Sequence, residues 1–439
     1  MGVGSFMDRT YLKDENSLTD KLAKFCSSSL TDETIVSTVS EILNDVRQNG
    51  DAAVLKRTFL YDCAKLSVEQ LKVSQKEIEC AKDQLSESEK FSILEAIENV
   101  TLFHERSIPE DWSTSNVHGA KIGEKHYPIN RVGIYVPGGN VPLISTVIMT
   151  VTIAKVAKVK EIVVVTPPDS EGKIASQMLA ALDLLGVTEI YKVGGAQAVG
   201  ALAYGTYSIP SVDKIVGPGN AFVNEAKRQV FGIVGIDLLP GPSEVMVIAD
   251  SSSNPSFVAA ALLAQAEHGS GKEKLYLLFS EESQFDEISN EINLQLEQLK
   301  HKDAVTGVLK SGFIAVHLSS FQRMADIANY IAPEHLELQV ANDHIDFFTS
   351  AITTAGAFLL GHVTSTSLGD FVAGPSHVLP TGRSSRFSSG LRLQDFMRRS
   401  SFIQYDNESA NQAKNSVEVF SKMEKLDGHG RSLSIRLPV

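Results

Sequence analysis

The sequence predicts an α/β protein built from two doubly wound domains, and three observations support that prediction. Short apolar runs between residues 131 and 249 alternate with stretches of helical spacing. The alternation resumes after residue 255. Glycine-rich turns close several of the apolar runs. Continuous apolar runs are typical of strands buried on both faces of a parallel sheet, with helices as the crossover connections between them.

The expected elements follow this pattern in chain order. The chain is polar and helical in spacing before residue 107, with one helix opening at Thr31 and ending at Gly50 and a Glu- and Lys-rich helical region over 75–106. The first α/β unit has expected strands at 132–136, 161–166, 189–193, 213–216 and 244–249, and expected helices at 145–159, 173–185, 197–204 and 221–230. The second unit, which we expect to share strands with the N-terminal region, has helices at 255–268 and 282–300 and strands at 274–279 and 312–318. The C-terminal region is expected to form helices at 389–398 and 408–426 and a short strand at 433–437.

The composition argues against several classes of protein. The chain has 439 residues, with 40 basic and 53 acidic side chains and a net charge of −13. This balance disfavours binding to nucleic acid or to an anionic membrane, because both require a basic surface. No apolar run is long enough to span a membrane or to serve as an N-terminal signal peptide. The three cysteines, Cys26, Cys63 and Cys80, are far apart, which favours a reducing compartment, and we expect a cytoplasmic protein.

One helix end carries a polar pair that could bind a cation. Asn254 and Pro255 suit the start of a helix, and Gly269 suits the position just after its end. Gln265 and His268 are three residues apart, so they lie on one face of its last turn. An amide oxygen and an imidazole nitrogen so placed are half of a small-cation site, or simply a helix cap. The spacing alone leaves both interpretations open.

Glycine-rich turns are expected at the carboxyl ends of the strands. They occur at 137–139, 194–195, 217–220 and 241–243. Open α/β sheets bind ligands at the carboxyl ends of their strands, so the turns indicate a crevice for a cofactor or substrate. The usual Gly-x-Gly-x-x-Gly dinucleotide fingerprint does not follow the first strand. The alternative is that these are ordinary tight turns.

Other candidate groups are scattered through the second half of the chain. Glu334 and His335 are adjacent and follow Pro333, which suits the first turn of a helix. A carboxylate beside an imidazole can act as a general acid and base, although adjacent Glu-His pairs are common. The remaining candidates, each equally compatible with a solvated side chain, are Asp370, His377 and His429. No spacing joins these residues to Gln265 and His268, so residue spacing does not yield a metal site.

Seven ordered segments together resemble the histidinol dehydrogenase family. These segments are 131–139 (RVGIYVPGG), 194–198 (GGAQA), 216–223 (VGPGNAFV), 241–245 (GPSEV), 265–269 (QAEHG), 332–336 (APEHL) and 377–381 (HVLPT). The resemblance runs from about residue 20 to the end of the chain. It implies an enzyme that uses zinc and NAD to oxidise a primary alcohol twice, through an aldehyde, to a carboxylate.

The resemblance also implies a role for each matching position. Glu334 and His335 would be the catalytic base pair. The NAD contacts would be Tyr135, Gln197 and Asn220; the zinc ligands would be Gln265, His268, Asp370 and His429; and the other substrate contacts would be Ser243, His377 and Glu424. The zinc ligands and His335 would also line the substrate site.

The fold implied by the resemblance is a pair of incomplete Rossmann-like domains in an intertwined homodimer. An N-terminal arm (1–28) would precede a larger metal-binding α/β domain formed by 29–130 with 244–380. Residues 131–243 would form the NAD-binding domain. The helical tail (381–439) would cross to the partner subunit, so that Glu424 and His429 would serve the neighbouring site.

Two positions depart from the usual pattern of the family. Thr366 stands where the histidinol enzymes usually carry a glutamate, and Arg431 lies two residues after the tail histidine. A lost carboxylate and an added arginine are features that an anionic substrate would favour. The expected substrate is L-histidinol, used in the last steps of histidine biosynthesis. The alternatives are another small alcohol, such as a sulfonated propanediol, and a non-catalytic relative that binds a metal or nucleotide.

Overall fold

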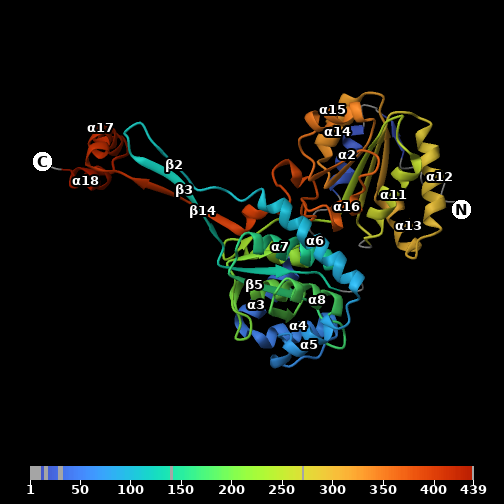
Figure 1. The fold of residues 1–439 in the computed structure, drawn as a ribbon, viewed down its shortest axis with the longest axis horizontal. Coiled ribbons are helices and arrows are strands. Elements are labelled where there is room, and N and C mark those ends of the chain that lie inside the picture. Colours follow the sequence, from blue (N-terminus) through green and yellow to red (C-terminus); the bar gives the residue numbers. More distant parts are fainter. Residues whose placement is uncertain (1–10, 14–17, 28–32, 139–141, 269–270, 438–439) are drawn as a thin grey trace.

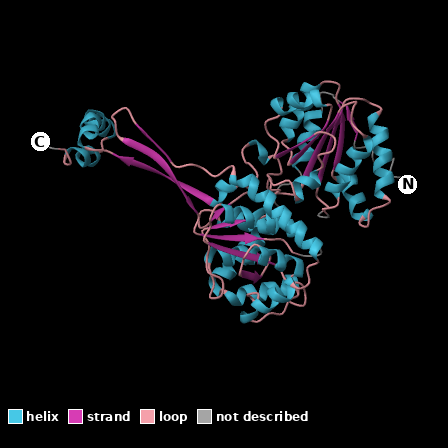
Figure 2. Ribbon diagram, in the orientation of Figure 1, coloured by secondary structure: helices cyan, strands magenta, loops and turns pink. Residues whose placement is uncertain are grey.

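The computed structural model describes residues 11–13, 18–27, 33–138, 142–268 and 271–437. The chain forms two lobes, each with a central sheet between layers of helices, and a long arm that projects away from them (Figures 1 and 2). The expected α/β class with parallel sheets is therefore confirmed. Gly139 and Gly269, two glycines of the motifs above, lie outside the described residues.

The first lobe is built on a five-stranded parallel sheet in the order β6-β5-β4-β7-β8. Its strands are β4 (Arg131–Tyr135), β5 (Glu161–Thr166), β6 (Glu189–Lys192), β7 (Lys214–Val216) and the unexpected β8 (Gly235–Ile236). Consecutive strands run outward from β4 in one direction and from β7 in the other. The strand order therefore reverses between β4 and β7, which is where open α/β sheets form their ligand crevice.

Helices cover both faces of this sheet. One face packs against α5 (Gln75–Lys82), α6 (Glu87–Glu105), α7 (Ile144–Val156) and α8 (Ser176–Leu184). The other packs against α3 (Glu33–Asn49), α4 (Asp51–Asp62), α9 (Gly195–Tyr204) and α10 (Ala221–Val230). A short 3-10 turn, η1 (Val68–Gln70), connects α4 to α5.

The expected grouping of 29–130 with 244–380 is wrong for the helices α3 to α6. The apolar stripe of α3, which includes Leu43 and Val46, packs on α9 of the first lobe. Gly200 permits this close approach, because a Cβ at that position would meet Leu43 and Val46 at 3.2 and 3.3 Å. The sheet is apolar on both faces, and the helices of 131–243 alone do not cover it, so the N-terminal helices complete the two layers.

The second lobe contains a six-stranded parallel sheet in the order β1-β11-β10-β9-β12-β13. Its strands are β1 (Tyr11–Lys13), β9 (Glu244–Ala249), β10 (Lys274–Phe279), β11 (Phe313–His317), β12 (His335–Gln339) and β13 (Ala357–Leu360). The helices α11 (Pro255–Ala266), α12 (Gln284–Leu296) and α13 (Lys302–Ser311) cover one face. The other face carries α2 (Leu18–Ser27), α14 (Phe321–Ile331) and α15 (Asn342–Ala351). The described part of 1–28 is therefore an edge strand and a helix of this lobe rather than a separate arm.

A three-stranded antiparallel ribbon forms the projecting arm, in the order β14-β3-β2. Its strands are β2 (Trp112–Ser115), β3 (Lys121–Pro128) and β14 (Met397–Gln404), and its tip carries α17 (Asn407–Glu424) and α18 (Asp427–Ser434) (Figure 1). The expected tail boundary at 381 is wrong, because Leu391, Leu393 and Phe396 are buried in the first lobe around η3 (Leu393–Phe396). The short turn η2 (Ser384–Arg386) precedes this segment.

Three local expectations also differ from the structure. The helix expected at 389–398 does not form, because residues 393–396 are the short turn η3 and residues 397–404 are β14, which pairs with β3 along its whole length. The segment expected as a strand at 433–437 begins inside α18. Pro333 does not open a helix, since His335 begins β12, which lies between β9 and β13. In each case long-range pairing or packing overrides local propensity.

His104 gives the first lobe a pH-dependent stability. Its side chain on α6 is 1% exposed, and neither ring nitrogen has a hydrogen-bond partner among the described residues. Burial lowers the pKa of His104 from 6.5 to about 4. The unfolded chain therefore takes up a proton below pH 6.5 that the folded chain does not, so stability is lost as the pH falls from about 6.5 towards 4.

We expect the free energy of unfolding to fall by about 2 kcal/mol between pH 7.5 and pH 5 through His104 alone. Urea denaturation at the two pH values would measure this loss in the wild type and in His104→Leu, which should lack it. His301→Leu, at an exposed position, is the matched control and should keep the full pH dependence. An equal loss in wild type and His104→Leu would contradict the assignment.

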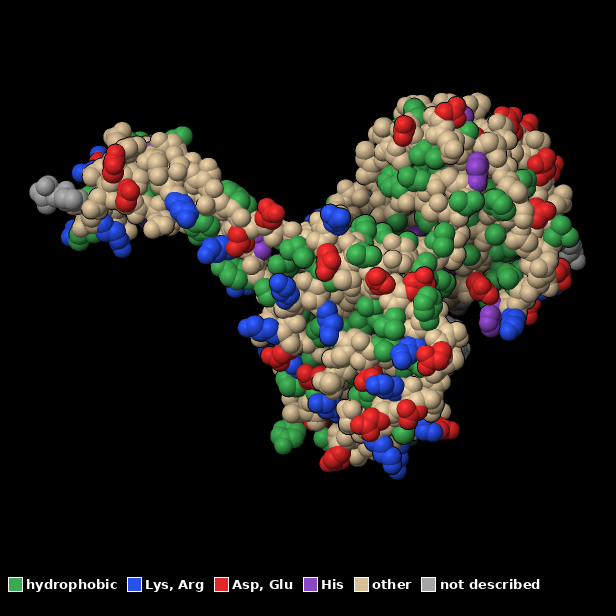
Figure 3. Space-filling view, in the orientation of Figure 1, with side chains coloured by type: hydrophobic (Ala, Val, Ile, Leu, Met, Phe, Trp, Pro, Cys, Tyr) green, Lys and Arg blue, Asp and Glu red, His purple; other side chains and the backbone are tan. Residues whose placement is uncertain are grey.

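Among the described residues, no helix combines the length and the apolar character needed to cross a membrane. On the face shown in Figure 3, Lys and Arg side chains are interspersed with Asp and Glu over the first lobe and the arm, while the second lobe shows mainly Asp and Glu.

Candidate active site

The first group of expected site residues lies where the strand order of the five-stranded sheet reverses. Tyr135 is the last residue of β4, and its hydroxyl accepts a hydrogen bond from the Gly195 backbone N–H at 3.0 Å. Burial raises the pKa of Tyr135 to about 12, so the hydroxyl keeps its proton. Gln197 is 1% exposed, and within the described structure neither atom of its amide has a partner. Asn220 caps α10 through Oδ1 and is itself exposed.

The second group lies at the amino ends of strands in the other lobe. Ser243 directly precedes β9, and Glu334 and His335 stand at the start of β12. The turn at 241–243 is therefore not at the carboxyl edge of the six-stranded sheet, where such a turn was expected to contribute to a crevice. In the first lobe the expected site residues lie at the carboxyl ends of the strands, as is usual for open sheets. In the second lobe they lie at the amino ends of the strands.

The backbone of Glu244 contacts both members of the expected catalytic pair, Glu334 and His335. Its N–H donates to Glu334 Oε2 at 2.7 Å, and its carbonyl oxygen lies 3.3 Å from His335 Nδ1. A carbonyl only accepts, so Nδ1 carries a proton and Nε2 is the nitrogen free for chemistry. The carboxylate of Glu334 lies 3.7 Å from His335 Nδ1. Adjacent residues on one strand are thus fixed by one residue of the neighbouring strand.

Asp370 contacts two histidines of the predicted site. It belongs to α16 (Thr366–Phe371), and its Oδ1 lies 3.4 Å from His335 Nε2. The Asp370 carbonyl accepts a hydrogen bond from His377 Nδ1 at 2.9 Å, while His377 Nε2 lies 3.3 Å from the Thr146 hydroxyl. Burial works against ionisation of Asp370, but His335 outweighs it, with contributions from His377 and His268, so the pKa of Asp370 is lowered.

The imidazole rings of His335 and His377 differ in charge. Burial disfavours the charged form of His335, but Glu334 and Asp370 outweigh it and raise the pKa of His335 to about 10. Burial lowers the pKa of His377, which is therefore neutral. A carboxylate that binds a cation attracts a neighbouring imidazolium less, so a cation at Asp370 lowers the His335 pKa towards the range in which an imidazole accepts protons.

The helix that carries Gln265 ends at Ala266, so His268 lies just after the helix rather than in its last turn, where it was expected. Gln265 is 1% exposed in the last turn of α11. Both atoms of its side-chain amide are buried and have no partner within the described part of the chain. His268 is exposed just after the helix and lies close enough to Asp370 to lower the pKa of that carboxyl. A buried amide without a partner is costly, and an incoming ligand or cation would satisfy it.

Comparison with known proteins decides the family. A family model for histidinol dehydrogenase matches residues 26–437. The chain belongs to the histidinol dehydrogenase family. Histidinol dehydrogenase of Lactiplantibacillus plantarum is 42% identical over 417 residues, which are 95% of this chain and 96% of that protein. The histidinol dehydrogenase of Aromatoleum aromaticum is also 42% identical, over 92% of each chain.

A solved structure of the same family shares the whole fold. The crystal structure of histidinol dehydrogenase from Elizabethkingia anophelis superposes with a TM-score of 0.90 at 33% identity and covers 97% of both chains. Both lobes and the arm therefore belong to the architecture of the histidinol dehydrogenase family. The resemblance inferred from the seven sequence segments is confirmed.

Two expected site residues do not join the others. Glu424 ends α17 and His429 lies in α18, and both are exposed. Figure 1 shows these helices at the tip of the arm, away from α11 and α16 in the second lobe. Arg431 is exposed on the same helix. Within one chain the tip of the arm does not reach the site, so these residues could contribute only to the site of another subunit.

Thr366 has a partner that the sequence did not reveal. It is 4% exposed, and its hydroxyl donates to Glu337 Oε2 at 3.2 Å. Glu337 is 1% exposed on β12, two residues after His335, and also accepts from Gln339. Burial raises the pKa of Glu337. A carboxylate therefore does lie beside residue 366. It belongs to Glu337 of β12 rather than to residue 366 itself.

Two other acidic residues near the site were missed by the sequence analysis. Burial raises the pKa of Asp62 to about 6, and its charge raises the pKa of Tyr135. Asp62 Oδ2 is buried without a described partner. The pKa of Glu244 rises to about 8, because its carboxyl is buried and because Glu334 lies nearby. No sequence signal marked either residue, since each is brought to the site by the packing of separate elements.

Proposed function

We propose that this chain oxidises L-histidinol through L-histidinal to L-histidine, in the last steps of histidine biosynthesis, with NAD and zinc. The observation that carries the proposal is the contact of Asp370 with both His335 and His377. Membership of the histidinol dehydrogenase family supports it, because the relatives named above carry that activity in their names.

The zinc site would be formed by Gln265, His268 and Asp370 of one subunit and His429 of a second. The described residues contain no group of three His, Cys, Asp or Glu side chains placed to hold a metal ion, so one chain alone does not offer a complete set. The buried, unpartnered amide of Gln265 fits the role of an oxygen ligand. Zinc, when bound, would hold and polarise the alcohol.

The NAD site would lie at the crevice of the five-stranded sheet. Tyr135 ends β4, Gln197 lies in the first turn of α9 after β6, and Asn220 caps α10 after β7. The Gln197 amide has no described partner, so a ligand could satisfy it. The amino end of α10 at Asn220 favours a negatively charged group such as a pyrophosphate. The site would take up two NAD molecules in succession, each of which would supply the acceptor for one hydride.

His335 and Glu334 would move the protons. His335 Nδ1 is held by the Glu244 carbonyl and Nε2 lies 3.4 Å from Asp370 Oδ1, so Nε2 would take the hydroxyl proton during each oxidation once Asp370 is engaged by the cation. Glu334 keeps Oε1 available while Oε2 accepts from the Glu244 N–H. Glu334 would activate the water that adds to the aldehyde, and the hydrate would then be oxidised to the acid.

Glu334→Gln is expected to oxidise the alcohol once and then stall, because an amide cannot activate water. Stopped-flow measurement with enzyme in excess would follow NADH and trap the aldehyde with a hydrazine. We expect about one NADH per alcohol, against about two for the wild type. Glu69→Gln, at an exposed glutamate in η1, is the control and should give the full yield. A full yield from Glu334→Gln would refute the proposed role.

A homodimer would complete the site. The arm ends in helix α17, whose buried side chains are the small residues Ser409, Ala410, Ala413 and Ser421. Large apolar side chains on the arm remain exposed: Ile403, Val419, Phe420, Met423, Leu426 and Ile435. Figure 3 shows hydrophobic side chains along the arm and over the adjoining faces of the lobes. Such a surface is typical of a protein interface, and a second subunit would bring Glu424 and His429 to the site.

The contact between Thr366 and Glu337 favours L-histidinol over an anionic alcohol. A carboxylate beside His335 attracts a substrate that carries an ammonium group and repels one that carries a sulfonate. The loss of a glutamate at position 366 therefore does not remove the negative group from this region. Arg431, the other departure, would reach the site only from the second subunit.

Glu337→Gln is expected to raise the KM for L-histidinol about tenfold, because the amide keeps the size of the side chain without its charge. Thr366→Val, which removes the hydroxyl alone, is the matched control and should change KM less. Steady-state kinetics would compare the two variants. An unchanged KM in Glu337→Gln would show that this carboxylate does not act on the substrate.

The proposed activity is tested by NADH formation with L-histidinol, with and without a metal chelator. Two NADH per alcohol, lost on chelation and restored by zinc, is the expected result. Turnover of a sulfonated propanediol without turnover of L-histidinol would select the other substrate. Metal bound without turnover of either alcohol would identify a non-catalytic relative.

A further inference from the structure

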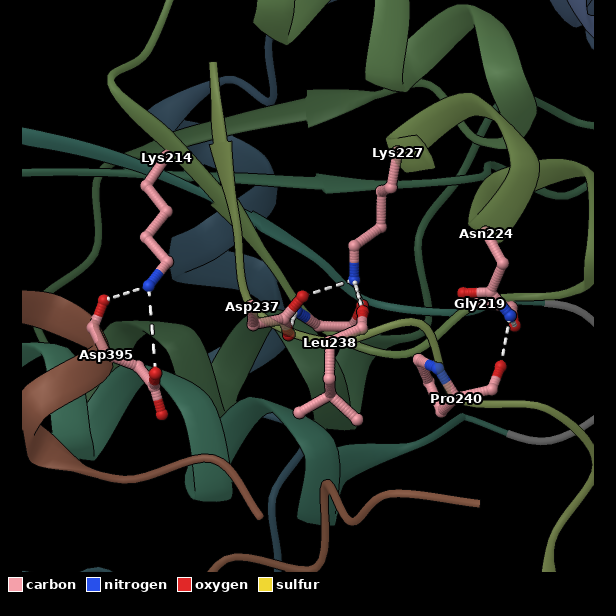
Figure 4. A network of polar contacts seen from close by, with 9 residues as sticks. Lys214, Gly219, Asn224, Lys227, Asp237, Leu238, Pro240 and Asp395 are labelled. Atoms are coloured by element: carbon pink, nitrogen blue, oxygen red, sulfur yellow. Dashed lines mark hydrogen bonds and ion pairs between the residues drawn. The ribbon is translucent and has the colours of Figure 1, made fainter. Parts of the chain in front are cut away.

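One face of helix α10 contacts two loops that lead to different parts of the site. The first loop is the turn 217–220, which follows β7 and ends at Asn220; we call it the cofactor turn. The second is the segment 237–243, which runs from β8 of the first lobe to β9 of the second; we call it the interlobe linker. Figure 4 shows both loops beside Lys227 and Asn224 of α10.

Lys227 donates to both loops from a fully buried position. Its side chain is 0% exposed, as is that of Asp237. The ammonium donates to the Gly217 carbonyl at 2.9 Å, to the Leu238 carbonyl at 2.8 Å and to Asp237 Oδ1. An ammonium has three donors, and all three are used. Lys227 thus joins the start of the cofactor turn to the start of the interlobe linker.

Asp237, at the start of the interlobe linker, also contacts the cofactor turn directly. Its Oδ2 accepts from the Gly217 N–H at 2.7 Å, so both polar groups of the Gly217 peptide unit are held by the ion pair. Gly217 has a φ of +112°, and a Cβ there would meet the Tyr135 carbonyl oxygen at 2.1 Å. The ion pair therefore fixes a peptide that lies directly against the backbone of a proposed NAD contact.

Asn224 repeats the connection one turn earlier on the helix. Residues 224 and 227 are three apart and share one face of α10. The Asn224 amide donates to the Gly219 carbonyl at 3.1 Å and to the Pro240 carbonyl. It therefore joins the end of the cofactor turn to the middle of the interlobe linker. Further along the linker, the Gly241 N–H donates to the Thr381 hydroxyl, and Ser243 leads into β9.

We propose that Asn224 and Lys227 are positioning residues that couple the cofactor turn to the interlobe linker. A ligand that orders the turn then also orders the linker and with it Ser243 and the start of β9, where Glu244 holds the catalytic pair. The inference rests on the proposed function only in taking NAD as the ligand of the turn. The coupling is reciprocal, because linked equilibria shift each other equally.

The arrangement is better suited to coupling than to stability alone. A buried ion pair contributes little net stability, since the cost of removing both charges from water offsets their attraction. The hydrogen bonds of Asn224 do not involve the ion pair, yet they join the same two loops. Two independent contacts with the same pair of partners define the relative position of those partners.

Hydrogen exchange measured by mass spectrometry would test the coupling without depending on turnover. In the wild type, NAD should slow exchange in both 217–220 and 237–243. In Asn224→Leu, which keeps a side chain of similar size without donors, NAD should protect the turn but no longer the linker. Arg228→Met is the matched control and should behave as the wild type. Arg228 lies on the same helix, and among the described residues its side chain bonds only to Glu225.

Kinetics and a second variant keep the test decisive. Asn224→Leu should lower kcat about tenfold with a smaller change in the KM for NAD, because the linker is misplaced after the cofactor binds. Lys227→Met combined with Asp237→Leu removes the other connection, including the acceptor of the Gly217 N–H, without leaving a buried charge unpaired, and should give the same exchange pattern. Linker protection by NAD in both variants would overturn the coupling. Absence of NAD binding to the wild type would instead overturn the proposed cofactor.

Discussion

Replacing His335 by asparagine is expected to lower kcat about a thousandfold while the fold and the metal content remain unchanged. Asparagine can still donate to the Glu244 carbonyl, as His335 Nδ1 does at 3.3 Å. It has no group that can take a proton at the position of Nε2, which faces Asp370. The variant therefore removes proton transfer and leaves the positioning contact in place.

Steady-state kinetics with L-histidinol and metal analysis of the purified variant would measure this effect. His317→Asn is the matched control, because His317 lies on β11 of the same sheet and contacts the Ser280 carbonyl. The control should retain kcat within a factor of about two. Activity of His335→Asn within tenfold of the wild type would show that another group accepts the proton. Loss of the metal from His335→Asn would show that the histidine is a ligand rather than a base.

A random mixture of two inactive variants is expected to recover about a quarter of the wild-type activity, and the isolated mixed dimer about half. His268→Ala lacks a proposed ligand in the second lobe, and His429→Ala lacks one at the tip of the arm. Each homodimer has both sites damaged. In a mixed dimer, the intact His268 of one subunit meets the intact His429 of the other, which restores one site of two. Random mixing makes about half of the dimers mixed, and about half of the sites in each mixed dimer are intact. About a quarter of all sites are therefore active.

Coexpression of the two variants with different affinity tags would isolate the mixed dimer and allow direct measurement of its activity and zinc content. The control is a mixture of His268→Ala with His335→Asn. Both positions belong to the second lobe, so each variant subunit carries one damaged second lobe. That mixture damages both sites and should stay inactive. No recovery in the first mixture would mean that the arm serves its own subunit or that His429 is not a ligand.

The regular elements of the two sheets were predictable from local pattern. The strand expected at 161–166 is β5 and the strand expected at 274–279 is β10, because a continuous apolar run is stable only between two layers of helices. The helix at 255–268 was recognisable from Asn254 and Pro255, and the structure confirms Asn254 as its cap and Pro255 at its start. These features depend on neighbours in the sequence.

The errors were made where partners distant in sequence decide the conformation. β14 follows a helical pattern in part but pairs with β3, more than 250 positions earlier. Helix α3 has an apolar stripe that fits any sheet, and only tertiary packing assigns it to the first lobe. His335 was expected near a helix start, yet the gap between β9 and β13 makes it a strand residue.

The sequence by itself determined the class of fold, most of the parallel strands, the family and the chemical groups available for catalysis. Only the tertiary structure decided how those groups meet: Glu244 between the members of the catalytic pair, Glu337 beside Thr366, and Asn224 and Lys227 between the two loops. The physical reason is that side-chain periodicity reports which face of an element is buried, while contacts between elements depend on three-dimensional packing that periodicity does not encode. The glycine-rich turns and the pair Gln265 and His268 marked the surroundings of the site, but the contacts of Asp370 with His335 and His377 exist only in the folded chain.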